Sequence, residues 1–319
     1  MRTLALFLLW LAALLLALAA IVPELGVAAW WALMWEFPRP HALVLAVVLG
    51  LAALALRAWI PLLAFAAVAA VQAAHVLPYT PLARPQVTRV LEAEAGAPIE
   101  LVVLNVKMDL EDRAPVIEYL RGIEPDILLL MEVDETWIEE VRPILDRYET
   151  TVSEPRGNYY GMVLATNLPA ERAEAHYFEK GTPAVVADLE APDGGLFTFL
   201  GLHPQPPQPG RDMSDHRDQL LEAGELARQA GRPVVAAGDF NEPGWATASR
   251  EFRRMGDYLD PRVGRFTRAS FDAGHPFMRF AIDHVYVTTG IDLISYGRGP
   301  EAGSDHRPIT ARFAVTPEG

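Results

Sequence analysis

The sequence predicts an α/β fold, a layered α/β sandwich that is preceded by about three transmembrane helices. Residues 1–79 are strongly apolar and almost uncharged, as membrane spans are. Beyond them, short apolar runs rich in β-branched residues alternate with amphipathic helical patterns, which is typical of sheets covered by helices. We therefore divide the chain into a transmembrane region over residues 1–79, a linker over residues 80–97 and a globular domain over residues 98–319.

The charge of the chain lies almost entirely in the predicted globular domain. The 319 residues carry a formal charge of −14, and residues 1–79 contribute only three arginines and two glutamates, so the remainder carries −15. This charge repels polyanions at long range, which argues against tight nonspecific nucleic-acid binding but permits cleavage at a locally positive cleft. The chain has no cysteine, which excludes disulfides and thiolate chemistry.

Residues 3–22 form the first predicted span. The run is uncharged and apolar, and its length suits a hydrocarbon core of about 30 Å. A cleaved signal peptide is the alternative, but the run is long for the apolar region of such a peptide and further apolar stretches follow it. We therefore favour a helix that is retained in the mature protein.

The apolar stretch over residues 42–77 is too long for one crossing. As a single helix it would extend about 54 Å, and Arg57 and Pro61 place a charge and a helix breaker near its middle. The pattern predicts a hairpin of two spans, at residues 41–57 and 59–77. An interfacial aromatic belt or a re-entrant segment is expected before this hairpin, from Trp30, Trp31, Trp35 and Phe37.

The sparse positive charges predict the orientation in the membrane. With three spans, Arg2 and Arg57 share one side, which the positive-inside rule makes the cytoplasmic side. The chain is then a multi-pass protein of the plasma membrane with its globular domain outside the cytoplasm. Two or four crossings would reverse this orientation.

The predicted domain follows a stretch, from Pro78 to about Ala97, that contains three prolines and no sustained period. Two segments have the 3.6-residue period of amphipathic helices, Asp112–Ile123 and Asp215–Gln229, and Gly231 follows the second as a helix stop. Seven short apolar runs predict buried strands, at residues 100–106, 126–131, 161–165, 184–189, 196–202, 233–237 and 281–287.

Polar residues follow several of these runs, where catalytic side chains are commonly presented. Glu132 follows the second run, His203 the fifth and Asp239 the sixth. Taken singly, Glu132 fits a strand cap, Asp239-Phe240-Asn241 fits an Asx turn, and the later segment Ser304-Asp305-His306-Arg307-Pro308 fits a surface turn held by proline. Taken together, they indicate a dispersed site for a metal ion and a phosphate.

Six segments of the domain, in this order, resemble motifs of the endonuclease/exonuclease/phosphatase superfamily, the DNase I-like hydrolases. The resemblance covers roughly residues 98–315. The segments are Leu104-Asn105-Val106, Met131-Glu132-Val133, Gly201-Leu202-His203, Gly238-Asp239-Phe240-Asn241, Ala281-Ile282-Asp283-His284-Val285 and Ser304-Asp305-His306-Arg307-Pro308.

The resemblance implies a four-layer α/β sandwich and a magnesium-dependent hydrolase that acts on phosphate ester bonds. The chain departs from many members at Lys107, where they carry a second asparagine, so that water or another group would complete the metal shell. The apolar leader is foreign to soluble members but similar to that of some bacterial relatives, which implies a bacterial-type inner membrane.

The same residues fit the chemistry of phosphate ester hydrolysis, which needs a cation, an activated water and a donor for the leaving oxygen. Glu132, helped by Asn105 and Asp305, offers oxygen ligands that suit Mg²⁺ or Mn²⁺ as cofactor. Zinc would be expected to recruit more nitrogen ligands.

The remaining residues are expected to move protons and to hold the phosphate. His306 would act as general base or phosphate contact, with Asp283 on its other ring nitrogen. Asp239 would orient or deprotonate the attacking water. Asn241 would hold a phosphate oxygen, while His203 would steady the opposite oxygen or protonate the leaving group.

Arginines near the motifs leave two alternatives open. Arg217 is either a helix-surface charge or a phosphate contact. A nucleic-acid cleft would require arginines to converge on the site, and the sequence alone does not decide whether they do. The candidates are Arg211, Arg217, Arg262, Arg265, Arg268 and Arg279.

The sequence thus predicts a membrane-anchored, metal-dependent phosphoesterase, with a nuclease-type phosphodiesterase as the first interpretation. A phospholipid or sphingolipid headgroup phosphodiesterase or phosphatase is the alternative, because anchoring brings the site close to lipid. A noncatalytic membrane scaffold is the second alternative. The expected partners are a phosphodiester substrate, from nucleic acid or a lipid headgroup, and the lipid bilayer, with no obligatory protein partner.

Overall fold

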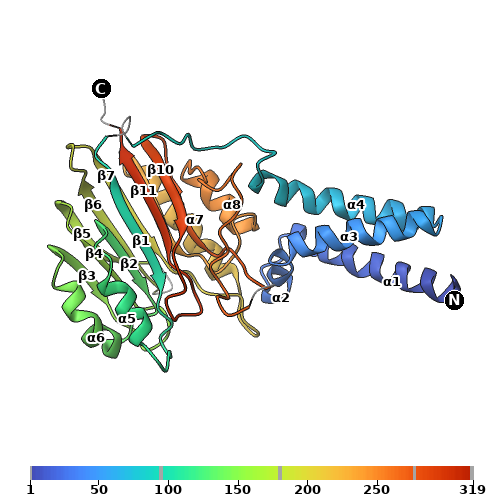
Figure 1. The fold of residues 1–319 in the computed structure, drawn as a ribbon, viewed down its shortest axis with the longest axis horizontal. Helices are drawn as coiled ribbons and strands as arrows, with labels where there is room; N and C mark the ends of the chain where they lie inside the picture. The colour runs from blue at the N-terminus through green and yellow to red at the C-terminus, as the bar shows by residue number, and fades with distance from the viewer. Residues whose placement is uncertain (1, 93–95, 179–181, 276–277, 317–319) are drawn as a thin grey trace.

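Two mixed β-sheets packed face to face form the domain in the computed structural model, which describes residues 2–92, 96–178, 182–275 and 278–316 (Figure 1). Helices cover the outer face of each sheet. The predicted four-layer α/β sandwich is therefore confirmed.

The first sheet has six strands in the order β10-β11-β1-β2-β4-β3. Its central pair, β1 and β2, runs parallel, and the other neighbouring pairs run antiparallel. The strands are β1 (Ile99–Asn105), β2 (Ile127–Met131), β3 (Thr150–Glu154), β4 (Met162–Thr166), β10 (Ile291–Arg298) and β11 (Ile309–Val315).

The second sheet has five strands in the order β5-β6-β7-β8-β9. Only β7 and β8 run parallel in it. The strands are β5 (Ala170–Tyr177), β6 (Pro183–Glu190), β7 (Leu196–Leu202), β8 (Val234–Asp239) and β9 (Asp283–Val287).

The pleat of the strands distributes their side chains between the layers, because successive residues point to opposite faces. Leu101 and Val103 of β1 lie in the core between the sheets, whereas Val102 and Leu104 pack beneath helices. The helices of the first sheet are α5 (Ala114–Arg121) and α6 (Glu135–Leu145), and those of the second are α7 (Ser214–Gln229) and α8 (Thr247–Met255).

All seven predicted strands and both predicted helices of the domain are present. The runs correspond to β1, β2, β4, β6, β7, β8 and β9, and the helices to α5 and α7. The local sequence pattern does not predict β3, β5, β10, β11, α6 and α8. Most of these elements are partly exposed, and their patterns are correspondingly polar.

The N-terminal region forms a bundle of apolar helices that projects from one side of the domain (Figure 1). Two segments, Arg2–Leu25 and Trp59–Tyr79, are long and apolar enough to cross a membrane, and Trp30–Glu36 with Arg39–Ala55 would add a third if this pair, bent by 64°, is one span. The helices are α1 (Arg2–Ile21), η1 (Val22–Leu25), α2 (Trp30–Leu33), η2 (Met34–Glu36), α3 (Arg39–Ala55), α4 (Trp59–Val76) and η3 (Leu77–Tyr79).

The outer surface of this bundle is apolar. Large hydrophobic side chains such as Leu11, Val48 and Leu63 are exposed on α1, α3 and α4. The N-terminus and the turn between α3 and α4 lie at the end of the bundle that points away from the domain (Figure 1). Arg57 lies in that turn, so the arrangement agrees with the expectation that Arg2 and Arg57 share one side.

The segment predicted to be a linker lies against the domain over part of its length. Val87 is buried in the core between the two sheets, and Arg89 forms an isolated β-bridge with Leu293 of β10. The amide of Gly264 donates to the carbonyl of Pro78. These contacts fix the chain between α4 and β1 on the surface of the domain.

A buried ion pair holds the segment between α8 and β9. Two nitrogens of Arg262, Nε and Nη2, donate to the two oxygens of Asp260 at 2.8 and 2.7 Å, and both side chains are fully buried. Burial raises the pKa of the Asp260 carboxyl, but the Arg262 guanidinium outweighs it and holds that pKa well below its usual range. Loss of either partner would leave an uncompensated charge inside the domain.

We expect Asp260→Ala to lower the free energy of unfolding by about 3–5 kcal/mol, because the Arg262 charge stays buried without its partner. The depressed pKa makes this contribution complete above the unfolded value of about 3.9 and lost as the pH falls below it. The difference in melting temperature between wild type and variant should therefore stay constant from pH 7 to about 4 and shrink only as the pH falls further. Exposed Asp257→Asn is the control, and a gap that persists at low pH would contradict the assignment.

Candidate active site

The carboxyl ends of both central parallel strand pairs meet at one edge of the sandwich. In the first sheet, β1 ends at Asn105 and β2 ends directly before Glu132. In the second sheet, β7 ends directly before His203 and β8 ends at Asp239. Side chains from the two sheets can therefore combine into one site, as at the strand ends of other α/β proteins.

Asn105 connects the two sheets at this edge. Its Nδ2 donates to Glu132 Oε1 at 2.9 Å and to Asp239 Oδ2 at 3.1 Å. Its Oδ1 accepts from the amide of Lys107 at 3.0 Å. The amide of Asp239 also reaches across to the Met131 sulfur at 3.1 Å.

Two site residues stand in the left-handed region of the backbone, which is unfavourable for side chains larger than glycine. Glu132 has φ 61° and Asn241 has φ 54°. Local hydrogen bonds hold both turns, since the amide of Met108 donates to Glu132 Oε2 at 3.2 Å and the amide of Asn241 donates to Asp239 Oδ1 at 2.8 Å. The turns bring these side chains over the strand ends.

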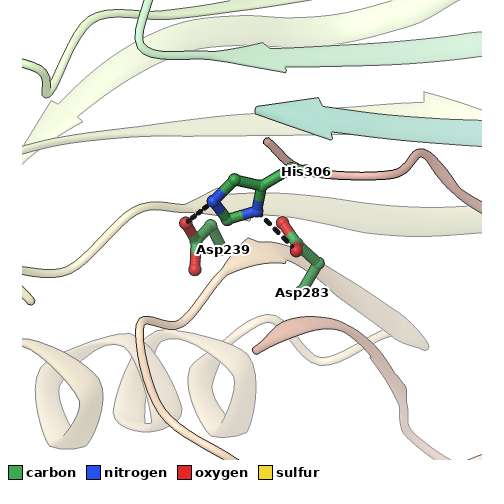
Figure 2. Close-up of side chains that lie close together, drawn as sticks. All are labelled: Asp239, Asp283 and His306. Carbon is green, nitrogen blue, oxygen red and sulfur yellow. Dashed lines mark hydrogen bonds and ion pairs between the residues drawn. The ribbon is translucent and has the colours of Figure 1, made fainter. Parts of the chain in front are cut away.

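His306 lies between two aspartates (Figure 2). Its Nδ1 is 2.8 Å from Asp283 Oδ2, and its Nε2 is 3.6 Å from Asp239 Oδ2. The ring is 4.8 Å from that of Phe271, centroid to centroid. Ser304 fixes the backbone here, because its hydroxyl donates to the carbonyl of Asn105 at 2.7 Å and accepts from the amide of His306 at 3.1 Å.

This arrangement favours an imidazolium at position 306. Burial lowers the pKa of His306, but the carboxylates of Asp283 and Asp239 outweigh it and raise that pKa to about 10. Burial and the neighbouring Asp283 charge raise the pKa of Asp239 to about 7. Near pH 7, Asp239 can therefore accept a proton from a water, while His306 stays an imidazolium.

His203 has a different environment. Burial and the charge of His306 lower the pKa of His203 to about 4, so its ring is neutral at pH 7. Its Nε2 is 3.8 Å from Asp239 Oδ2, and its Nδ1 is buried without a hydrogen-bond partner. The side-chain amide of Asn241 donates to the carbonyl of Pro204 at 2.9 Å, which connects the Asn241 turn to the segment after His203.

Asp305 lies at the more open side of the site. Its Oδ2 is 3.4 Å from Lys107 Nζ, and this carboxylate raises the pKa of Lys107. Burial raises the pKa of Glu132, and the Asp305 charge adds to that rise. The carboxylates of Glu132 and Asp305 therefore repel one another, and the Lys107 ammonium lies beside Asp305.

Arg217 is placed away from these contacts. Its Nε and Nη2 donate to both oxygens of Glu251 on α8, at 2.5 and 3.0 Å, and the side chain is half exposed. Arg217 is thus paired with Glu251 on the helix surface in this structure. Arg262 likewise forms its buried ion pair with Asp260.

A compact group of potential metal ligands occurs within the described residues. One ligand atom each of Asp239, Asp283 and His306 lies within 4.8 Å of the others, and all three side chains are buried. The sequence assigned the metal to Asn105, Glu132 and Asp305 instead. The two sets adjoin one another, because Asn105 bonds to both Glu132 and Asp239.

The family model of the endonuclease/exonuclease/phosphatase family matches residues 102–306. The chain belongs to this family. Its six predicted motifs lie in or next to the matched region, in the order of the sequence analysis. Membership in the endonuclease/exonuclease/phosphatase family places the protein among hydrolases of phosphate esters. A comparison with curated protein sequences finds no match.

Solved structures of the same fold include three with high coverage. The endonuclease/exonuclease/phosphatase from Bacteroides vulgatus matches with a TM-score of 0.56 and 15% identity over 69% of this chain and 100% of its own. The human Nocturnin catalytic domain with bound sulfate anion matches with a TM-score of 0.56 and 16% identity, over 73% of this chain and 100% of its own. Truncated Caenorhabditis elegans TDP2 matches with a TM-score of 0.52 and 15% identity, over 70% of this chain and 100% of its own. At these identities the likeness shows the fold.

Sequence reasoning missed two supporting residues of this endonuclease/exonuclease/phosphatase site. Ser304 lies within a recognised motif. A serine commonly accepts a hydrogen bond from the backbone amide two residues later, and Ser304 accepts one from the amide of His306. His216 contacts Glu242 at 3.2 Å and the carbonyl of Gln205 at 2.7 Å, on the segments that follow Asn241 and His203. No local pattern marks His216, because its partners come from elsewhere in the chain.

Gly238 permits the close approach of β8 to β7 beside Asp239. Its φ is +146°, and a Cβ there would lie 1.8 Å from the carbonyl oxygen of Leu202. We expect Gly238→Ala to destabilise the fold by more than about 4 kcal/mol, since backbone atoms would have to move. Gly231→Ala is the matched control, because Gly231 also has a positive φ but no atom lies within 4 Å of an added Cβ. It should lower the free energy of unfolding by about 1 kcal/mol. Equal melting temperatures of the two variants would contradict this explanation.

Proposed function

We propose that this protein is a membrane-anchored phosphodiesterase that uses a divalent metal ion and hydrolyses its substrate by attack of water. The observation that carries the proposal is the chain Asp283–His306–Asp239, which lies next to Asn105 and Glu132 at one edge of both sheets. This edge combines groups that move protons with carboxylates that suit a cation.

The donor set fits a hard cation such as Mg²⁺ or Mn²⁺. Four carboxylates, those of Glu132, Asp239, Asp283 and Asp305, face two cationic groups, His306 and Lys107. We assign the metal to Glu132, Asn105 and Asp305, because oxygen donors suit these ions and the protonated His306 ring is a poor ligand. A bound ion would offset negative charge on the phosphate and lower the pKa of a water.

In this proposal Asp239 carries the proton chemistry and His306 contacts the phosphate. Asp239 accepts the proton of the attacking water or orients that water, which its raised pKa of about 7 favours. His306 holds a phosphate oxygen as an imidazolium, and Asp283 fixes the orientation of its ring through Nδ1.

Asn241 and His203 hold the phosphate from the second sheet. The turn at Asn241 presents a side-chain amide next to Asp239. His203 is neutral, and its Nε2 faces the site at 3.8 Å from Asp239 Oδ2, so this nitrogen donates a hydrogen bond to a phosphate oxygen or to the leaving oxygen.

A cluster of arginines favours a nucleic-acid type of phosphodiester as substrate. Arg279 and Arg307 both lie 3.6 Å from Glu301, and Arg307 is next to His306 in the chain. Burial lowers the pKa of Arg298, and the charges of Arg307, Arg279 and Arg268 lower it further. These four arginines, with Glu301 as their acidic neighbour, form a positive area beside the site in an otherwise acidic protein.

A lipid headgroup is the second candidate substrate, and the position of the N-terminal bundle favours it. The segment between α1 and α3 contacts three places on the domain: the amide of Met213, just before α7, donates to the carbonyl of Ala28, Thr247 at the start of α8 bonds to Glu36, and Phe280 packs on Phe37. If the bundle lies in a bilayer, the site opens close to the lipid surface. We propose a bacterial-type inner membrane with the domain on its extracytoplasmic side.

A noncatalytic scaffold is less consistent with this geometry. A decayed site would be expected to have lost at least one of its interacting groups, whereas Asn105, Glu132, Asp239, Asp283 and His306 all make site contacts. We propose no obligatory protein partner.

We expect the full chain in detergent to hydrolyse a small aryl phosphodiester with Mg²⁺ or Mn²⁺ and to lose this activity with a chelator. Glu132→Gln, Asp239→Asn and His306→Gln should each lower kcat by about 10²–10⁴-fold, because they remove a cation ligand, the proton acceptor and the cationic phosphate contact, respectively. The exposed Glu139→Gln on α6 should leave kcat unchanged. Activity that survives chelation, or that survives in Glu132→Gln, would sink the proposal.

Arg268→Ala should raise KM for duplex DNA and single-stranded RNA by about 3–10-fold and leave the small aryl diester unaffected, because only an extended polyanion reaches the arginine cluster. The slope of log kcat/KM against log salt should become shallower by about 0.9. Arg228→Ala, on the exposed face of α7, is the control. Rapid hydrolysis of phospholipid vesicles, with the nucleic acids left intact, would establish the lipid candidate instead.

A further inference from the structure

Helix α8 begins without a capping side chain of its own. Its N-cap residue is Ala246, which offers no side-chain acceptor. The carboxylate of Glu36, from the N-terminal region, takes that role: Glu36 Oε1 accepts from the amide and from the hydroxyl of Thr247, each at 3.0 Å. Glu36 is 1% exposed, so water does not substitute for it. A side chain 211 residues distant in sequence thus caps the helix.

The contacts around this cap are buried on both sides. The indole of Trp245 donates to the backbone carbonyl of Glu36 at 2.7 Å, and its ring packs edge-on against Tyr79 at 5.5 Å. Trp245 and Tyr79 are 6% and 4% exposed. On α8, Arg250 Nη1 is 3.0 Å from His75 Nδ1 at the end of α4. The N-terminal bundle is therefore docked on the start of α8.

The capped segment is the direct continuation of the active-site turn. Asn241 is held at one end by Asp239, and Glu242 is held by His216 at 3.2 Å. The carbonyl of Glu242 also lies 2.8 Å from His284 Nε2. Residues 242–246 are thus fixed at one end by the site and at the other by Glu36.

We propose that Glu36 is a positioning residue of the active site: by capping α8 from the N-terminal region, it sets the course of residues 242–246 and so the placement of Asn241. The N-terminal helices are then a structural part of the active site in addition to an anchor. The kinetic part of this proposal rests on the proposed function, whereas the structural part does not.

Amide hydrogen exchange on the full chain in detergent, with kinetics on the aryl phosphodiester, tests this proposal. We expect Glu36→Ala to speed exchange at residues 241–250 by about 10-fold, since a lost cap typically weakens the first helical turn by about that factor. The value of kcat should fall about 10-fold with KM little changed. Glu36→Gln keeps a carbonyl acceptor and should restore both quantities to near wild type. Glu139→Ala, on the opposite helical layer, is the control.

Thr247→Val serves as a milder variant in case Glu36→Ala does not fold. It removes the hydroxyl donor and retains the amide, so exchange should rise about 3-fold. Unchanged exchange in either variant would overturn the cap. Faster exchange at residues 247–250 with unchanged exchange at Asn241 would overturn the positioning role. An inactive wild type would count against the proposed function alone, because exchange at Asn241 still decides the role of Glu36.

Discussion

The side-chain amide of Asn105 is the connection on which the arrangement of the site depends. It donates to Glu132 in its own sheet and to Asp239 in the other, so it fixes the spacing between these two carboxyl groups. Both carboxylates have raised pKa values because of burial, and a single neutral donor between them limits their repulsion without adding charge. The sandwich brings the two sheets together, and Asn105 makes their edges act as one site.

The sequence identified the elements that are buried on both faces. Runs such as residues 127–131 and 234–237 are continuously apolar because helices cover one face and the second sheet covers the other. Edge strand β5 alternates polar and apolar residues weakly, and α6 contains Pro143, so local pattern did not distinguish them from loops. Their formation depends on neighbours that are distant in sequence.

The site was predictable to the extent that it depends on residue type at strand ends. Glu132, His203 and Asp239 stand where apolar runs stop, and the structure brings them together. The contributions of Glu36 and His216 were not predictable, because neither residue has a local signal and both act through contacts across the fold. The positions of the arginines were not predictable from the sequence either. Arg262 is buried in an ion pair with Asp260, whereas Arg298 and Arg307 lie close to one another.

The bundle is attached to the domain at two separate stretches of chain. One stretch, between α1 and α3, contacts Met213 and Thr247, and the other, after α4, is held by Val87 and Arg89. A single attachment would allow the domain to rotate relative to the bundle, whereas two separate attachments prevent this rotation. The direction in which the active site opens is therefore fixed relative to the axis of the bundle, and a substrate must approach along that direction.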